Sequence, residues 1–313
     1  MRGVQERIDY DEFGLFHENA AEVGLPYDGP PTVSRVSVEV GPGRRLSALR
    51  WGTGDPQLVL VHGGAQNAHT WDTVAMALDC PLLAVDLPGH GHSDGPGDRA
   101  GGQLSAQGNA EDVAVVIREL ATHARAVVGM SLGGATTIAL TRVAPDLVRR
   151  MVLVDITPGV TGPKSQQISN FINGPESFAR FDDILARTIE FNPTRSESSL
   201  RRGILHNAEQ REDGSWVWRY ARFRAGMGSK GSVTAAPGAP DFAPLWDVLG
   251  EVTVPVMLCR GLLAQSVVDD DDEAELLRRL PDARVEHFAN AGHSIQGDMP
   301  IELAEAIRTF AAL

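Results

Sequence analysis

Two patterns of apolar and polar residues recur along this chain. Residues 32–40 alternate with the period of two that is typical of a strand, and Gly41-Pro42-Gly43 predicts a turn into residues 45–51, which complete a hairpin. Other short runs are almost continuously apolar, which indicates strands buried on both faces of a sheet. These runs are residues 57–62, 81–87, 124–130, 148–156, 252–260 and 283–288.

Helical periodicity separates the buried strands. It is found at residues 70–78, 104–120 and 300–310, and helix-compatible residues also follow the run 124–130. Strands that alternate with helices in this way predict an α/β fold with a mostly parallel, doubly wound sheet.

Residues 157–250 interrupt this alternation. They show no buried-strand pattern, but they have helical patterns at 165–172, 175–190 and 196–210, followed by a loop-prone tract at 226–240. They also hold ten of the chain's eighteen aromatic residues. We expect a helical cap over the carboxyl edge of the sheet, with an apolar cavity beneath it.

These patterns predict three parts. Residues 1–31 form an N-terminal extension, residues 32–156 and 251–313 form the α/β core, and residues 157–250 form the cap. The extension carries several apolar residues and ends in a proline-rich loop, so we expect it to pack on its own chain. The alternative is a subunit contact in a homo-oligomer.

Charge and composition narrow the class of protein. The formal net charge of −13 argues against nucleic acid or an anionic membrane surface as a partner. The first residues contain no apolar stretch that could serve as a signal core, and no run reaches membrane-spanning length. Cys80 and Cys259 lie at or in strand-like runs, so we expect buried free thiols and a soluble, cytoplasmic protein.

A serine lies where a strand is expected to meet a helix. The apolar run 124–130 leads into Gly129-Met130-Ser131-Leu132-Gly133. This is the context of a nucleophile elbow, in which neighbours without a Cβ let the strand and the helix close around the serine. The pentapeptide alone fits equally well a tight turn in which serine is merely small. Ser131 is therefore the candidate nucleophile.

A second glycine turn, His62-Gly63-Gly64, ends the apolar run 57–62. Such a turn can direct a backbone N–H group at a developing oxyanion. We expect the N–H of Gly64 to act together with that of Leu132, with Ala65 as the neighbouring candidate. A plain glycine turn after a strand is the alternative.

Four motifs in chain order resemble those of the α/β-hydrolase superfamily. They are the His-Gly-Gly turn, the segment Asp86-Leu87-Pro88-Gly89-His90-Gly91-His92-Ser93-Asp94, the elbow and Ala291-Gly292-His293. The resemblance covers roughly residues 32–156 and 251–313. It implies that the segment 86–94 is mainly structural, so we do not expect His90 or His92 to be catalytic. The family's order of nucleophile, acid and histidine implies His293 as the catalytic base.

The catalytic acid has two candidates. In most members of the superfamily it lies a few residues beyond the strand expected at 252–260, where the first carboxylate of this chain is Asp269. Asp269 opens the acidic run 269–273 before a helical stretch at 274–280, and acidic residues stabilise a helix start, which also argues against a metal site. Asp155 instead ends an apolar strand, where a buried carboxylate needs a cationic or N–H partner. Some members, including lactonases that open zearalenone, place the acid there, so Asp155 is preferred and Asp269 is the alternative.

The resemblance implies a serine hydrolase that cleaves a carboxylic ester or a lactone through an acyl-enzyme, with neither cofactor nor metal. Serine at position 131 argues against the epoxide-hydrolase and haloalkane-dehalogenase branches, which use aspartate there. Carbon–carbon bond hydrolases of ring-cleavage products and non-catalytic ligand-binding homologues are the alternatives. The aromatic cap, and the lack of a basic cluster beside the motifs, favour a bulky, neutral, apolar small-molecule substrate such as the macrolactone zearalenone.

Overall fold

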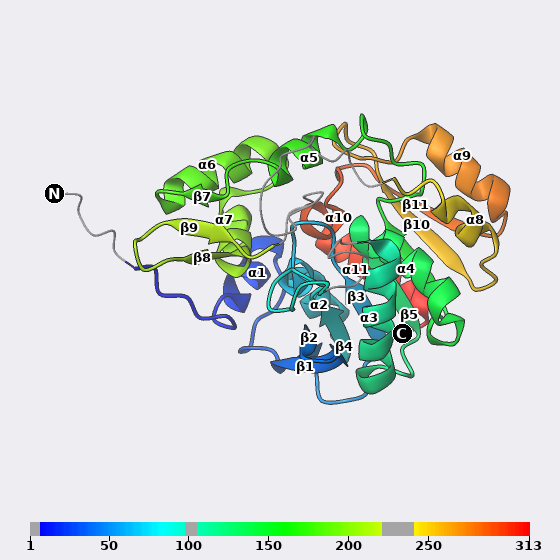
Figure 1. The fold of residues 1–313 in the computed structure, drawn as a ribbon, viewed down its shortest axis with the longest axis horizontal. Helices are drawn as coiled ribbons and strands as arrows, with labels where there is room; N and C mark the ends of the chain where they lie inside the picture. Colours follow the sequence, from blue (N-terminus) through cyan, green and yellow to red (C-terminus); the bar gives the residue numbers. More distant parts are fainter. Residues whose placement is uncertain (1–6, 98–104, 221–240) are drawn as a thin grey trace.

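An eight-stranded sheet forms the centre of the molecule (Figure 1). The computed structural model describes residues 7–97, 105–220 and 241–313; the loop-prone tract expected at 226–240 lies outside these residues. The strand order is β1-β2-β4-β3-β5-β6-β10-β11. The strands are β1 (Val33–Gly41), β2 (Arg44–Trp51), β3 (Leu58–Val61), β4 (Leu82–Val85), β5 (Ala126–Met130), β6 (Met151–Val154), β10 (Val256–Gly261) and β11 (Arg284–Phe288). Pairs from β4 to β11 are parallel, whereas β1–β2 and β2–β4 are antiparallel, so the mostly parallel sheet is confirmed.

Helices cover both faces of the sheet because its strands alternate their side chains between two cores. In β5, the side chain of Val127 belongs to the apolar core on one face of the sheet, and that of Val128 belongs to the core on the opposite face, each core being covered by a layer of helices. The first layer contains α3 (Ala106–Leu120), α4 (Leu132–Val143), α8 (Leu245–Gly250) and α9 (Asp270–Arg279). The second contains α1 (Phe16–Val23), α2 (Asp72–Leu78), α10 (Ile295–Asp298) and α11 (Pro300–Ala311). The short 3-10 helices η1 (Ala68–Trp71) and η3 (Pro145–Leu147) join these elements.

The segment after β6 lies across one end of the sheet (Figure 1). It contains α5 (Gln166–Ile172), α6 (Phe181–Phe191) and α7 (Glu197–Asn207). It also contains a three-stranded antiparallel sheet of β7 (Ser177–Phe178), β8 (Ala208–Gln210) and β9 (Trp216–Trp218), in the order β7-β9-β8.

Two of the helix boundaries expected in the cap are wrong. The helix expected at 175–190 begins at Phe181, and the one expected at 196–210 ends at Asn207, because strands occupy the remaining residues. Strands of two or three residues are too short to show a period of two, and their partners are distant in sequence. Within the expected cap range, α8 packs against α4 of the core.

The described part of the N-terminal extension packs on its own chain. Phe16 is only 2% exposed, and its ring meets that of Trp51 edge-on at a centroid distance of 5.2 Å. Glu22 of α1 pairs with Arg202 of α7, so the extension contacts both core and cap. The homo-oligomer contact remains a prediction. Among the described helices, none is both long and apolar enough to cross a bilayer.

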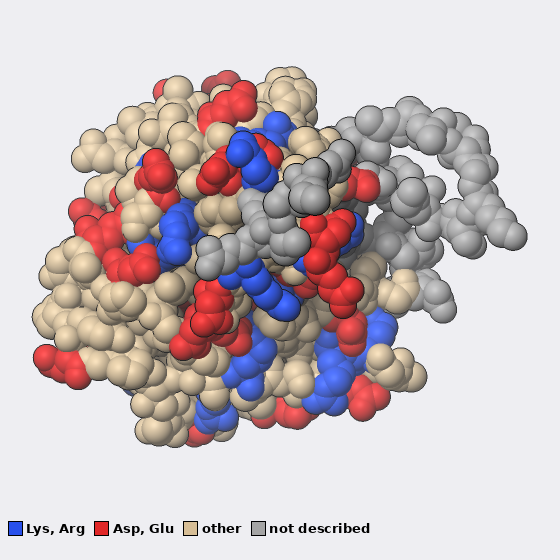
Figure 2. Space-filling model, turned by 90° about the vertical axis from the view of Figure 1, so that its left-hand side faces the viewer, with Lys and Arg blue, Asp and Glu red and all other residues tan. Residues whose placement is uncertain are grey.

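Charged side chains are mixed on the face shown in Figure 2. Lysine and arginine side chains lie between aspartates and glutamates and do not gather into one broad basic area on this face. Of the two cysteines, both of which are free thiols, Cys259 is buried and Cys80 is only partly buried.

Candidate active site

Ser131 lies at the sharp turn between β5 and α4. Its φ of 50° and ψ of −118° belong to a region that residues with side chains rarely adopt, which is the strain expected of a nucleophile elbow. A Cβ added at Gly129 would overlap the backbone of Gly133, and one added at Gly133 would overlap the carbonyl of Val61. The two glycines therefore allow strand and helix to approach closely, as the sequence predicted.

Asp155 lies beside the elbow because β5 and β6 are adjacent and in register. Met130 pairs with Val154, so the residues that follow them, Ser131 and Asp155, leave the sheet side by side. Both residues have positive φ, 50° and 47°. The sheet's own hydrogen bonds thus set the relative position of the nucleophile and this carboxylate.

The Asp155 carboxylate is fully buried and accepts four hydrogen bonds. Oδ1 accepts from the N–H of Gly261 at 3.0 Å and from the hydroxyl of Ser266 at 2.7 Å. Oδ2 accepts from the N–H of Val267 at 3.0 Å and lies 2.9 Å from Nδ1 of His293. Such a carboxylate is stable as a buried anion and fixes the orientation of the imidazole.

Asp269 has a different role in the structure. It is the N-cap of α9 and forms a reciprocal capping box with Asp272. Its carboxylate also lies 2.6 Å from Nζ of Lys164, and the hydrogen bond from Lys164 lowers the pKa of Asp269. The structure therefore brings Asp155, and not Asp269, to the histidine. The acidic run is the first turn of a helix, which begins at Asp270 rather than at the expected residue 274.

Gly64 of the His-Gly-Gly turn lines the same cavity as Ser131. The N–H of Gly63 donates to the side chain of Gln66 at 3.1 Å, and the N–H of Ala65 donates to Nε2 of His90 at 3.2 Å. These contacts favour Gly64 over Ala65 as an oxyanion donor. Leu132 is the first residue of α4, where backbone N–H groups have no acceptor within the helix.

His90 supports this turn and is not itself positioned as a base. Burial lowers its pKa to about 3, so the ring is neutral. Nδ1 lies 3.0 Å from the carbonyl of Pro88, to which it donates, and this leaves Nε2 to accept from Ala65. The side chain of Asn207, at the end of α7, donates to the carbonyl of Ala65 at 2.6 Å. The cap and the 86–94 segment thus hold the turn from two sides.

The cavity above Ser131 has a volume of about 140 Å³ and a mixed lining. Its apolar wall includes Phe171 and Phe191, but glutamine, asparagine, lysine and arginine side chains also line it. Most other described cap aromatics pack elsewhere; Phe178, Phe181 and Trp216, for example, form the cap's own core. Counting aromatic residues in the sequence therefore overstated how apolar the cavity is.

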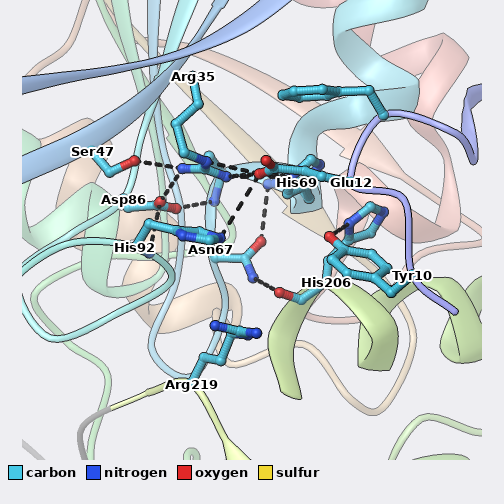
Figure 3. Close-up of polar contacts among 12 residues, drawn as sticks. Tyr10, Glu12, Arg35, Ser47, Asn67, His69, Asp86, His92, His206 and Arg219 are labelled. Carbon is cyan, nitrogen blue, oxygen red and sulfur yellow. Dashed lines mark hydrogen bonds and ion pairs between the residues drawn. The ribbon is translucent and has the colours of Figure 1, made fainter. Parts of the chain in front are cut away.

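A partly buried cluster of polar side chains joins the extension, the core and the cap (Figure 3). Glu12 contacts both Arg35 and His69, and Arg35 also bonds Asp86 at 2.8 Å. Burial lowers the pKa of His69, but Asp72 and Glu12 outweigh burial and raise this pKa to about 9. Sequence reasoning missed this cluster because its members are scattered over three parts of the chain.

His69, Asp72 and His206 bring three possible metal-ligand atoms within 4.8 Å of one another. However, the imidazoles of His69 and His206 are stacked, with centroids 3.9 Å apart and planes 10° from parallel. Imidazole binds a metal ion in the plane of its ring, and one ion cannot lie in two stacked planes. As placed, these side chains form a hydrogen-bonded stack and not a coordination site.

The fold, the nucleophile elbow and the carboxylate–histidine pair together indicate the class of protein to which this chain belongs. Residues 58–306 match the model described as the alpha/beta hydrolase family, and this chain belongs to that family. It is 43% identical to "Esterase Rv0045c" of Mycobacterium tuberculosis over 98% of both chains. A solved structure of that esterase has a TM-score of 0.82 and 42% identity, covering 98% of this chain and 100% of that one. The chain is also 25% identical to the "Putative 2-succinyl-6-hydroxy-2,4-cyclohexadiene-1-carboxylate synthase" of Bacillus subtilis, covering 88% of this chain and 97% of that one.

Proposed function

We propose that this protein is a serine esterase with Ser131 as nucleophile, His293 as general base and Asp155 as the acid that orients it. The observation that carries the proposal is the 2.9 Å contact between Asp155 Oδ2 and His293 Nδ1 beside a cavity lined by both Ser131 and His293. The similarity to a mycobacterial esterase over nearly the whole chain supports ester hydrolysis.

The geometry supports a two-step mechanism. Nε2 of His293 takes the proton of Ser131 as its Oγ attacks the ester carbonyl, and the N–H groups of Gly64 and Leu132 bind the oxyanion. The alcohol leaves with a proton from His293, and water then cleaves the acyl-enzyme with His293 again as base. The charge of buried Asp155 stabilises the imidazolium in both steps.

The cavity bears on the finer choice of substrate. A bulky apolar ester, or a macrolactone such as zearalenone, is the prediction from sequence, but a volume of about 140 Å³ with polar walls favours a short acyl chain. We therefore propose short carboxylic esters as the first substrates to test and lactones as the second. Rates on p-nitrophenyl esters from acetate to dodecanoate should fall with chain length; fastest turnover of the longest esters, or of zearalenone, would contradict this choice.

Covalent labelling tests the mechanism itself. A fluorophosphonate should label the native protein at Ser131, and Ser131→Ala should abolish labelling. His293→Ala should slow it strongly because the serine loses its base. An unlabelled native protein would refute the esterase proposal and favour a non-catalytic homologue.

A further inference from the structure

Arg195 occupies the wall between two adjoining cavities. It directly precedes Ser196, the N-cap of α7. The first cavity contains Ser131, and the second, of about 340 Å³, extends towards α1 and α2. Residues common to both linings are Gln66, Phe171, Asn192, Thr194, Arg195 and Asp298. The side chain is therefore part of the surface that a substrate bound at Ser131 would meet.

The guanidinium of Arg195 has more donors than acceptors around it. Of its five N–H donors, Nη2 bonds the hydroxyl of Ser199, whereas Nε is buried with no acceptor among the described residues. Burial lowers the pKa of Arg195, and the charges of Asp298 and Glu22 only partly oppose this. Glu22 already pairs with Arg202. A partly buried guanidinium whose Nε has no acceptor among the described residues gains free energy from an anionic partner.

The second nearby acid, Asp298, is also engaged. Oδ1 accepts from the hydroxyl of Thr194 at 3.0 Å, and Oδ2 accepts from the N–H of Gly292 at 2.9 Å. A Cβ added at Gly297, in the short helix that follows His293, would overlap Nη1 of Arg195. Glycine at this position therefore leaves room for the guanidinium, which is held against the segment that carries the catalytic base.

We propose that Arg195 determines specificity by binding a carboxylate on the substrate, so that the preferred esters are half-esters of short dicarboxylic acids. This inference rests on the proposed esterase function. The planar guanidinium can bind a carboxylate through two parallel hydrogen bonds, and the small first cavity limits the chain between the two carbonyl carbons. It also replaces the neutral substrate expected from sequence by an anionic one.

Paired substrates test the proposal. The kcat/KM of the native enzyme is measured on monoethyl succinate, glutarate and adipate and on neutral ethyl esters of matched length, such as ethyl pentanoate. We expect about a 30-fold preference for at least one half-ester, the range of a charged hydrogen bond. Arg195→Met should bring this ratio near one, mainly through KM, and Arg195→Lys should retain part of it because the charge remains.

The control variant is Arg201→Met, in helix α7 that follows Arg195; its side chain is 44% exposed and outside both cavity linings. It should keep the native ratio and the native rate on p-nitrophenyl acetate. Glutarate should also inhibit native p-nitrophenyl acetate hydrolysis competitively, with neutral glutaramide far weaker, a readout that needs no variant. Equal rates on half-esters and neutral esters, with p-nitrophenyl acetate still cleaved, would overturn the carboxylate subsite alone. Absence of all these activities would overturn the esterase proposal and the subsite with it.

Discussion

Asp155→Asn separates the two candidate acids, because the structure gives Asp155 a contact with His293 that Asp269 lacks. The side-chain amide nitrogen of the new asparagine would replace either Oδ1 or Oδ2 of Asp155, and each of these oxygens now accepts hydrogen bonds from donors. At Oδ1 it meets the N–H of Gly261 and the hydroxyl of Ser266, which can turn and accept; at Oδ2 it meets the N–H of Val267 and the ring of His293. The first orientation leaves one N–H unsatisfied and should destabilise the fold by about 1–3 kcal/mol.

The effect on catalysis should be much larger than this structural cost. Two unit charges 2.9 Å apart, the distance from Asp155 to His293, interact by about 6 kcal/mol at an effective dielectric constant of about 20. If the transition state loses that stabilisation of the imidazolium, kcat falls about 10⁴-fold. The assay is kcat on p-nitrophenyl acetate, with active enzyme counted by fluorophosphonate titration and folding checked by thermal melting.

Asp269→Asn is the matched control. It weakens the capping box of α9 and the contact with Lys164, so about 1 kcal/mol of stability should be lost with kcat changed less than about threefold. If the folded Asp155→Asn enzyme keeps kcat within tenfold of the native value, or if Asp269→Asn loses more, Asp155 is not the catalytic acid.

Three further changes test other parts of the structure. His69 has a folded pKa of about 9, above its ordinary 6.5, so its stabilisation is complete below about pH 6.5 and is lost as the pH rises through about 9. His69→Gln should therefore cost up to about 3 kcal/mol in urea unfolding at pH 6 and much less at pH 10, and an equal cost at both would refute the charge assignment. His90→Leu removes the acceptor of the Ala65 N–H and should lower kcat about tenfold, whereas His90→Gln, which can still accept, should lose less; equal kcat values would contradict a supporting role. Gly133→Ala should destabilise the protein by about 3 kcal/mol in urea unfolding because its Cβ would overlap the backbone at Val61, and an unchanged urea unfolding curve would show that the elbow is not tightly packed.

The sequence predicts the parts of the fold whose signals are local. Each buried strand is a short apolar run, and the glycines around Ser131 directly indicate the close approach of strand and helix. The short cap strands and α1 were missed because pairing and packing with distant residues decide their structure. Propensity carries little information for such segments.

The candidate site was predicted less completely than the fold. Chain order indicates Ser131 and His293, but it leaves Asp155 and Asp269 both open. The choice depends on the loop that follows β10, which folds back so that Ser266 and Val267 donate to Asp155. Arg195 carried no signal in the sequence, since nothing local distinguishes an arginine that lines a cavity from one on the surface.

The register of β5 and β6 has a consequence for redesign. Because adjacent strand ends carry both Ser131 and Asp155, the loop after β10 supplies hydrogen-bond donors but no charged group of the proposed triad. Residues 262–265, two of which line the cavity beside Ser131, can then be exchanged to reshape its wall, provided that Ser266 and Val267 are kept. In a hydrolase whose acid lies on that loop, the same remodelling would move the acid itself. Here this part of the cavity wall and the charged groups of the proposed triad belong to separate elements, so the wall can diversify without disturbing them.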